Sequence, residues 1–362
     1  MEIYLLIMGL LVVLSMANPI IKKEEINKLL FTAIAVILIL LAGLRHYSVG
    51  RDTLQYINAY TGITPLDRYE LGFSSFLNLL YKFSTDFQFL IFVSSVIIFI
   101  PIMYLIFRHS KNYYFSLYLL IAFNYYAIYL NAMRQSMAVA IVLVANELYR
   151  YNKNCKIFIF LIVSAVLFHN SAIIAVLIPL LYKIKLKTPN ILLGLIVFCG
   201  IGFCTKDLFI LIAEHISEYL PNVMYYTYID SYEAQVNYSG IVLQGILYLL
   251  IFLSLYIIVK NSKDCEEDCN FYLNCIYLSV LFLVLSSQAT VLERFKFYFD
   301  IYLIVAVPMV FSKIKNLITK SIAYLVVFTI GFAYWYIIAL YRPYWTETID
   351  YKIGRASCRE RV

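Results

Sequence analysis

Long runs of apolar residues alternate with short polar segments along this chain. Most runs are long enough to cross a hydrocarbon core of about 30 Å as a helix. They predict about ten transmembrane helices, at residues 3–21, 27–44, 88–107, 113–130, 132–149, 190–212, 239–259, 271–288, 296–311 and 321–340. We find no linker-like segment and no internal repeat. The pattern therefore predicts an all-α polytopic membrane protein with one transmembrane domain over residues 1–352.

A further apolar stretch, residues 157–182, contains Phe168-His169-Asn170-Ser171 near its middle and Pro179 near its end. It is either one tilted span or a re-entrant helical hairpin. Cytoplasmic loops carry an excess of Lys and Arg, and the hairpin places 16 of 26 such residues on one side, whereas a full crossing places 13 there. The charge distribution therefore favours the hairpin, with both termini outside. We expect a plasma membrane as the location.

The amino-acid composition also indicates a membrane protein, and the last ten residues change the net charge. Of 362 residues, 63% are hydrophobic and 14% are charged, against about a quarter charged in soluble proteins, which excludes a soluble globular protein. Residues 353–362 resemble the translation of a common sequencing adapter, so we set them apart as an artefact. Without their three Arg and one Glu the formal net charge falls from +7 to +5. We expect the native chain to end a few residues beyond Lys352.

The exterior end of the second predicted span carries a cluster of charged residues. Arg45, Arg51 and Asp52 lie within eight residues, with His46 between them and Gly50 permitting a tight turn. The planar guanidinium of arginine matches phosphate oxygens and stays charged at any working pH. The segment is suited to binding a pyrophosphate at the membrane surface. The alternative is interfacial anchoring, in which the arginines only reach the lipid headgroups.

A second cluster, Arg134-Gln135, opens the fifth predicted span. Helix N-terminal amides favour an anion, so the guanidinium and the amides could converge on one phosphate. An ionisable group at membrane depth is a functional hypothesis by default. The alternative is a structural salt bridge between Arg134 and an acid such as Asp52 or Glu70.

Two further positions could take part in chemistry. His169 lies at the proposed tip of the hairpin, where a neutral imidazole could accept a proton from a sugar hydroxyl. A structural, hydrogen-bonded histidine is the alternative. Glu293-Arg294, followed by Lys296 and Asp300, forms another exterior charged cluster, for which phosphate binding or proton transfer competes with ion pairing.

The two longest exterior loops are residues 45–87 and 213–238. In the first, Glu70 leads into an amphipathic stretch that ends near Lys82 and that we expect to lie along the interface. The second is rich in tyrosine, which suits an interfacial aromatic belt, with sugar contact as a secondary function. The chain has no P-loop, no H-E-x-x-H motif and no Asp-x-Asp pair. We therefore expect no metal and no other cofactor.

Taken in order, these motifs resemble the EpsG family of bacterial membrane proteins, which are similar to Wzy-type polysaccharide polymerases. The resemblance spans residues 2 to about 350 and rests on the following segments: Gly43-Leu44-Arg45, Val49-Gly50-Arg51-Asp52-Thr53 with Tyr56, Glu70-Leu71-Gly72-Phe73, Asn131 with Arg134-Gln135, Phe168-His169-Asn170-Ser171-Ala172, and Pro343-Tyr344. Arg51 departs from the family pattern, which more often has a small or polar residue there.

The resemblance implies polymerisation of exopolysaccharide, capsule or O-antigen repeats carried on undecaprenyl diphosphate, by metal-independent glycosyl transfer in a GT-C-like helical architecture. The leaving diphosphate would be held by Arg45, Arg51, Arg134 and Arg294, with Gln135. One further residue would take the acceptor proton, and the candidates for that base are His169, Asp52, Glu70 and Glu293. Expected partners are the lipid-linked glycan, the bilayer, a chain-length regulator and a flippase, with no nucleic acid. Two alternatives stay open: a lipid-linked oligosaccharide flippase or transporter, and a membrane acyltransferase.

Overall fold

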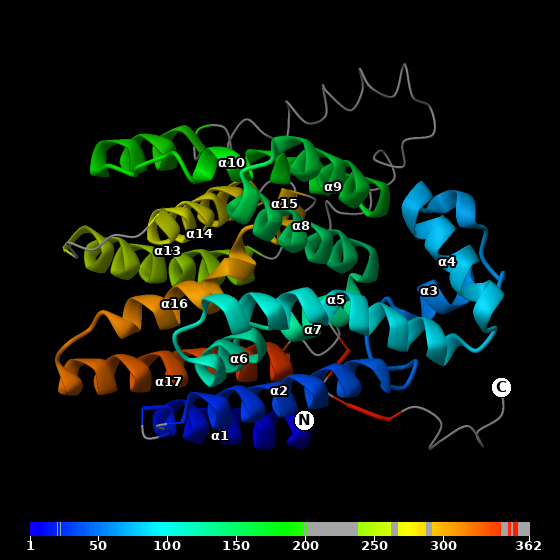
Figure 1. The fold of residues 1–362 in the computed structure, drawn as a ribbon, viewed down its shortest axis with the longest axis horizontal. Helices are drawn as coiled ribbons and strands as arrows, with labels where there is room; N and C mark the ends of the chain where they lie inside the picture. Colours follow the sequence, from blue (N-terminus) through cyan, green and yellow to red (C-terminus); the bar gives the residue numbers. More distant parts are fainter. Residues whose placement is uncertain are drawn as a thin grey trace. The chain divides into compact units, whose positions relative to one another are not determined.

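The computed structural model describes residues 1–19, 21, 23–198, 200, 238–261, 267–286, 292–341, 347–348 and 350–353. Within these ranges the chain is helical, with one isolated β-bridge between Arg45 and Ile353 (Figure 1). Its contacts group into two compact units. Unit 1 comprises Met1–Val176 and Ile304–Val362, and unit 2 comprises Leu177–Leu303. The organisation as one transmembrane domain stays a prediction.

Unit 1 contains most of the helices. They are α1 (Glu2–Ala17), α2 (Glu24–Gly43), α3 (Thr53–Tyr60), η1 (Leu66–Arg68), α4 (Leu71–Phe83), α5 (Phe87–His109), α6 (Tyr113–Ala122), α7 (Tyr125–Asn131), α8 (Met133–Asn152), α9 (Cys155–Phe168) and α17 (Leu317–Tyr341), with nearly all of α16 (Leu303–Ser312) and of η2 (Asn170–Leu177). Helix α4 is the amphipathic stretch that the sequence predicts after Glu70.

Four helices in the described residues are long and apolar enough to cross a membrane, and a fifth span results if α7 and α8 are counted as one bent pair. All four match predicted spans closely: α2, α5 and α17 match 27–44, 88–107 and 321–340, and the helix over Asp268–Ser286 matches 271–288. The all-helical membrane class is therefore confirmed, whereas the number of about ten spans stays a prediction.

The predicted helix over residues 113–130 is in fact divided at Asn124, which has a left-handed backbone with φ of 65°. Asn tolerates this conformation better than most residues because its short polar side chain can bond locally. The first piece, α6, has ten residues, about 15 Å, which is too short to cross. It is buried from Tyr114 to Ala122 and packs against α1 and α17, as a helix that is apolar on every face requires.

A second break separates α7 from α8, whose axes differ by 118° around Ala132. Broken helices at membrane depth are tolerated where protein surrounds the freed backbone groups. The residues flanking this bend, Leu130 and Met133, are buried. The bend places the first turn of α8, which carries Arg134, beside other helix ends instead of in the middle of a straight span.

The stretch 157–182 is also interrupted where the sequence predicts. Helix α9 ends at Phe168, His169 takes an extended conformation as its C-cap, and the 3-10 helix η2 follows. The break at Phe168–Ser171 is thus present. The re-entrant hairpin and the sidedness derived from it stay predictions.

Unit 2 contains α10 (Ile178–Leu181), a helix over Thr188–Phe198, α13 (Tyr238–Asn261), α14 (Glu267–Ser286), α15 (Glu293–Lys296) and η4 (Asp300–Tyr302). Helices α13 and α14 pack against each other. The predicted span 296–311 is divided among the end of α15, η4 and α16. Residues 213–237 of the tyrosine-rich loop and most of the span 190–212 lie outside the described residues, as do Pro343-Tyr344 and residues 354–362.

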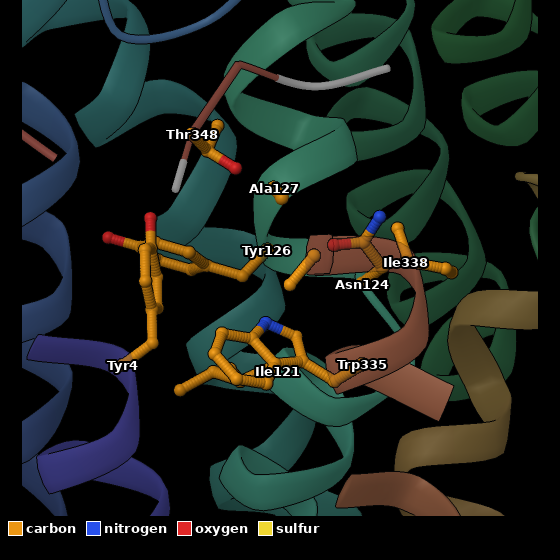
Figure 2. Close-up of a pocket in the computed structure, with 9 residues that line it drawn as sticks. Tyr4, Ile121, Asn124, Tyr126, Ala127, Trp335, Ile338 and Thr348 are labelled. Carbon is orange, nitrogen blue, oxygen red and sulfur yellow. The ribbon is translucent and has the colours of Figure 1, made fainter. Parts of the chain in front are cut away.

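A small cavity lies in the core of unit 1. The rings of Tyr4, Tyr126 and Trp335 gather around it with Asn124 (Figure 2), and the Tyr126 hydroxyl donates to the carbonyl of Leu38 at 2.7 Å. Its volume is about 10 Å³, room for about one water molecule. None of the side chains lining it is charged. We regard it as a packing feature and place no chemistry there.

Candidate functional site

Three helix ends of unit 1 bring Glu70, Arg134 and His169 together. Glu70 is the N-cap residue of α4, Arg134 lies in the first turn of α8, and His169 is the C-cap of α9. In the sequence, Arg134 follows Glu70 by 64 positions and His169 follows it by 99. The helix breaks described above are therefore what assembles this cluster.

The Glu70 carboxylate connects the other two side chains. Its Oε1 lies 3.0 Å from Nδ1 of His169, and its Oε2 accepts a hydrogen bond from Nη1 of Arg134. The side chains are 13%, 9% and 22% exposed for Glu70, His169 and Arg134. An ion pair shielded to this degree is stronger than a surface pair, because water screens it less. The Arg134–Glu70 pair is one of the two alternatives that the sequence left open.

Burial of the Glu70 carboxyl works to raise its pKa, but the hydrogen bond from His169 and the charge of Arg134 outweigh it and lower the pKa to about 2. The N-terminus of α4 also favours a negative charge at this position. Glu70 is consequently ionised at neutral pH. A carboxylate that holds its charge so firmly is a poor general base, because proton acceptance is efficient only when the pKa lies near the working pH.

An ionised Glu70 determines which nitrogen of His169 carries the proton. A carboxylate can only accept hydrogen bonds, so the Nδ1–H of His169 donates to it. In the neutral ring, Nε2 is then the basic nitrogen. A histidine whose tautomer and orientation are set by a carboxylate is the arrangement by which enzymes remove a proton from a hydroxyl group.

Tyr56 and Tyr69 surround the Arg134 guanidinium. The guanidinium carbon lies 5.1 Å from the centre of the Tyr69 ring, within the range of a cation–π contact, and the side chain is hydrogen-bonded to Tyr56. Burial raises the pKa of Tyr56 to about 12, although the charge of Arg134 opposes this. Tyr56 therefore stays a neutral hydroxyl beside the guanidinium. Tyr69 was not predicted from the sequence, where its one signal was its place directly before Glu70.

Aromatic rings continue from these tyrosines toward His169. Phe73 lies 5.4 Å from Tyr56 and 6.3 Å from Phe76, measured between ring centres, and Phe76 lies 6.2 Å from Phe168. Phe73 is buried, whereas Phe76 and Phe168 are partly exposed. The site thus combines a proton acceptor and a cation with apolar faces, the features that a sugar with apolar C–H faces and many hydroxyls can contact.

Gly72 explains how α4 comes close enough to α9. A Cβ atom at this position would lie 2.8 Å from the carbonyl oxygen of Leu167 and 2.9 Å from its carbonyl carbon. The obstacle is backbone, so no side-chain rotation relieves it. The glycine in Glu70-Leu71-Gly72-Phe73 therefore permits the contact that holds Glu70 beside His169.

We expect Gly72→Ala to separate α4 from α9. Overpacking of this kind costs about 1–3 kcal/mol, so the melting temperature in detergent should fall. Gly9→Ala in α1 is the matched control, because a Cβ there meets nothing within 4 Å and alanine is the better helix former. Equal melting temperatures for the two variants would contradict this account of Gly72.

The segment 43–53 adopts a structure of its own. Gly50 has φ of +101°, and a Cβ there would lie 2.6 Å from the Thr53 hydroxyl, so this turn requires glycine. Arg45 is 2% exposed. Its guanidinium donates to the carbonyls of Ala42 and Leu130, at 2.7 and 3.0 Å, and to the Ser95 hydroxyl at 3.1 Å. Arg45 thereby connects the end of α2 to α5 and to the α7–α8 bend.

The other residues predicted in this part of the site differ in exposure. Arg51 is exposed, and Asp52 is the half-buried N-cap residue of α3. Asp52 lies close enough to Tyr56 for its charge to act on that hydroxyl, as Arg134 does. Gln135 is buried next to Arg134. The structure therefore gathers Asp52 and Arg134 around Tyr56 and Tyr69, and Glu70 connects Arg134 to His169.

Glu293 and Arg294 belong to α15 in unit 2. Glu293 is ion-paired with Lys296, Oε1 to Nζ at 3.1 Å, and Lys296 also lies 3.7 Å from Oδ2 of Asp300. Lys296 and Asp300 are buried, at 1% and 0% exposure. Ion pairing, one alternative for this cluster, is thus present within unit 2.

The arrangement offers proton transfer and anion binding. Within the described ranges, no group of three or more His, Cys, Asp or Glu residues is placed to hold a metal ion. The side chains that meet at the three helix ends are instead a base, its carboxylate partner and a cation.

Comparison with known proteins relates this chain to a family. The EpsG family profile covers residues 28–353, nearly the whole chain. No curated protein and no solved structure is significantly similar to the chain.

Proposed function

The chain belongs to the EpsG family of Wzy-like polysaccharide polymerases, and on this premise we propose that it joins undecaprenyl-diphosphate-linked repeat units at the outer face of the bacterial plasma membrane. Family membership and the apolar helices make it a membrane protein of exopolysaccharide biosynthesis. The lipid-linked substrate, the outer face and the use of the product in capsule or O-antigen are parts of the proposal.

The observation that carries the proposal is the hydrogen-bonded series His169–Glu70–Arg134. A hydroxyl oxygen of the acceptor repeat attacks the anomeric carbon of the growing chain and forms the new glycosidic bond. The bond between that carbon and the diphosphate oxygen breaks, and lipid diphosphate leaves with the electron pair. Nε2 of His169 takes the hydroxyl proton, and Glu70 stabilises the imidazolium that forms.

The other candidate bases are less suited to this step. The pKa of about 2 gives Glu70 a supporting role, and Glu293 is engaged by Lys296. Asp52 lies near Tyr56 and takes part in the electrostatics of the site. We therefore assign the proton transfer to His169, with Glu70 as the residue that positions it.

Cationic side chains would stabilise the charge on the departing diphosphate without a metal ion. We propose Arg134, with Gln135 beside it, and the exposed Arg51 as contacts of the diphosphate in unit 1. Arg294, in unit 2, stays a predicted phosphate-binding residue. Arg45 differs because its guanidinium is buried and bonded to protein acceptors. We propose that it positions the α7–α8 bend from which Arg134 extends.

The experiment is to deplete the protein and to separate the lipid-linked glycans by length. We expect single repeats to accumulate on the outer face while long chains disappear. Single repeats trapped on the cytoplasmic face would overturn the proposal in favour of a flippase. Chains of normal length that lack acyl groups would overturn it in favour of an acyltransferase, which the His169–Glu70 pair could also serve. A chain-length regulator and a flippase are the proposed protein partners.

A further inference from the structure

A basic pocket lies in unit 2, in residues to which the polymerase reaction assigns no role. Its volume is about 510 Å³, within the range of small-molecule sites. Three lysines line it, Lys185, Lys187 and Lys260, together with the polar side chains of Thr188, Tyr256 and Asn270. None of its lining residues is acidic. We refer to it as the lysine pocket.

The wall that carries Lys185 and Lys187 is fixed to α14 by buried side chains. The Asn274 amide donates to the carbonyls of Leu181 and Ile184, at 2.6 and 2.8 Å. The Tyr277 hydroxyl donates to the carbonyl of Ile191 at 2.8 Å. Asn274 is 3% exposed and Tyr277 is 8% exposed. Residues on both sides of the two lysines are therefore anchored.

The opposite wall is formed by the end of α13. The Tyr256 and Thr188 hydroxyls lie 3.0 Å apart, so a hydrogen bond connects this wall to the first. The Lys260 ammonium lies 5.8 Å from the centre of the Tyr256 ring, within cation–π range. Like-charged lysines repel one another, and an anion between them would relieve that repulsion.

An exposed apolar stripe runs along α13 toward Lys260. Ile246, Leu250, Leu253 and Ile257 are all exposed, and their spacing of four, three and four residues places them on one helix face. Lys260 follows three residues after Ile257 and continues that face. An apolar stripe that ends at a positive pocket matches the two parts of a phospholipid, acyl chains and a charged headgroup.

We propose that the lysine pocket binds the phosphate of an anionic phospholipid, with the acyl chains along the exposed face of α13. Basic pockets between membrane helices on the cytoplasmic side bind such headgroups. The distribution of Lys and Arg predicts this side for Lys185, Lys187 and Lys260. Charge complementarity selects a headgroup with net negative charge, such as phosphatidylglycerol, over the zwitterionic phosphatidylcholine.

The test uses the purified full-length chain in non-ionic detergent, with phosphatidylglycerol, phosphatidylcholine and inorganic phosphate as separate probes. Native mass spectrometry counts the bound lipids, and thermal unfolding measures the stabilisation. We expect phosphatidylglycerol alone to bind and to raise the melting temperature. Each lysine charge that is lost should weaken binding about 5-fold, so K185Q/K187Q/K260Q should lose it almost completely.

Two matched variants make the result specific. K111Q/K315Q/K320Q removes the same charge from unit 1 on the same predicted side and should bind phosphatidylglycerol as the wild type does. K185R/K187R/K260R keeps the charge and should retain binding. Equal binding by K185Q/K187Q/K260Q and the wild type would overturn the proposal. Stabilisation by inorganic phosphate equal to that by phosphatidylglycerol would show a site for a soluble anion and overturn the lipid assignment.

Discussion

Replacing His169 with alanine is expected to slow chain elongation about 10²- to 10⁴-fold, the usual contribution of a general base. The reason is geometric as well as chemical. Nδ1 of His169 lies 3.0 Å from Glu70, so the carboxylate fixes the ring with Nε2 as the basic nitrogen. Alanine removes the proton acceptor and leaves the arginines in place. The measurement is the length distribution of polysaccharide made by cells that contain only the variant.

His109→Ala is the matched control. His109 is also paired with a carboxylate, Nε2 to Oε2 of Glu147 at 2.8 Å, and its side chain is 10% exposed. It lies at the far end of α5, whose C-terminus is predicted to be cytoplasmic. This variant should lose some stability and keep long chains. Long chains from His169→Ala at wild-type protein levels would exclude His169 as the base.

The membrane class could be predicted directly from the sequence, because a long run of apolar residues is enough by itself to predict a membrane-spanning helix. Helices α2, α5 and α17 are local consequences of such runs. The interruption at Asn124 was not predicted, because its neighbours on both sides are apolar and hydropathy cannot separate a lipid-facing helix from one enclosed by protein. The ten-residue α6 is the result: it is buried among α1, α17 and other helices of unit 1.

The residues of the candidate site could each be identified from the sequence as charged positions. Which of them pair with one another could be predicted only in part. Glu70 was one of two acids considered for Arg134. The contact between Glu70 and His169 joins positions 99 residues apart, and no periodicity relates a helix start to a distant helix end. Gly72 in the same motif was a sequence signal for this contact, because a glycine is required where α4 meets the backbone of α9.

Glu70→Gln is expected to destabilise the protein by about 3 kcal/mol, because it leaves the Arg134 charge in a partly buried site without its carboxylate. Arg134→Gln should destabilise it by a similar amount. The double variant should lose less than the sum, since neither charge is then left alone, with a coupling of about 0.5–3 kcal/mol. Melting temperatures in detergent test this, and strict additivity would show that the Glu70–Arg134 pair contributes nothing to folding.

The melting temperatures of the wild type and Glu70→Gln should differ in a pH-dependent way if the Glu70 carboxylate is the source of the lost stability. The pKa of Glu70 falls from 4.5 to about 2 in the folded chain because the hydrogen bond from His169 and the charge of Arg134 outweigh the opposing effect of burial. A pKa lowered by folding stabilises the protein above pH 4.5, and that stabilisation is lost as the pH falls from 4.5 toward 2. The melting temperatures of the wild type and Glu70→Gln should therefore differ most at pH 7, draw closer as the pH falls from 4.5 to 3, and converge only below about pH 2, where the folded carboxylate also takes up a proton. Glu70→Gln/Arg134→Gln is the reference for other acid effects, because it lacks both charges. A gap between wild type and Glu70→Gln that stays constant from pH 7 to pH 3 would mean that the glutamine disturbs packing instead of removing the charge.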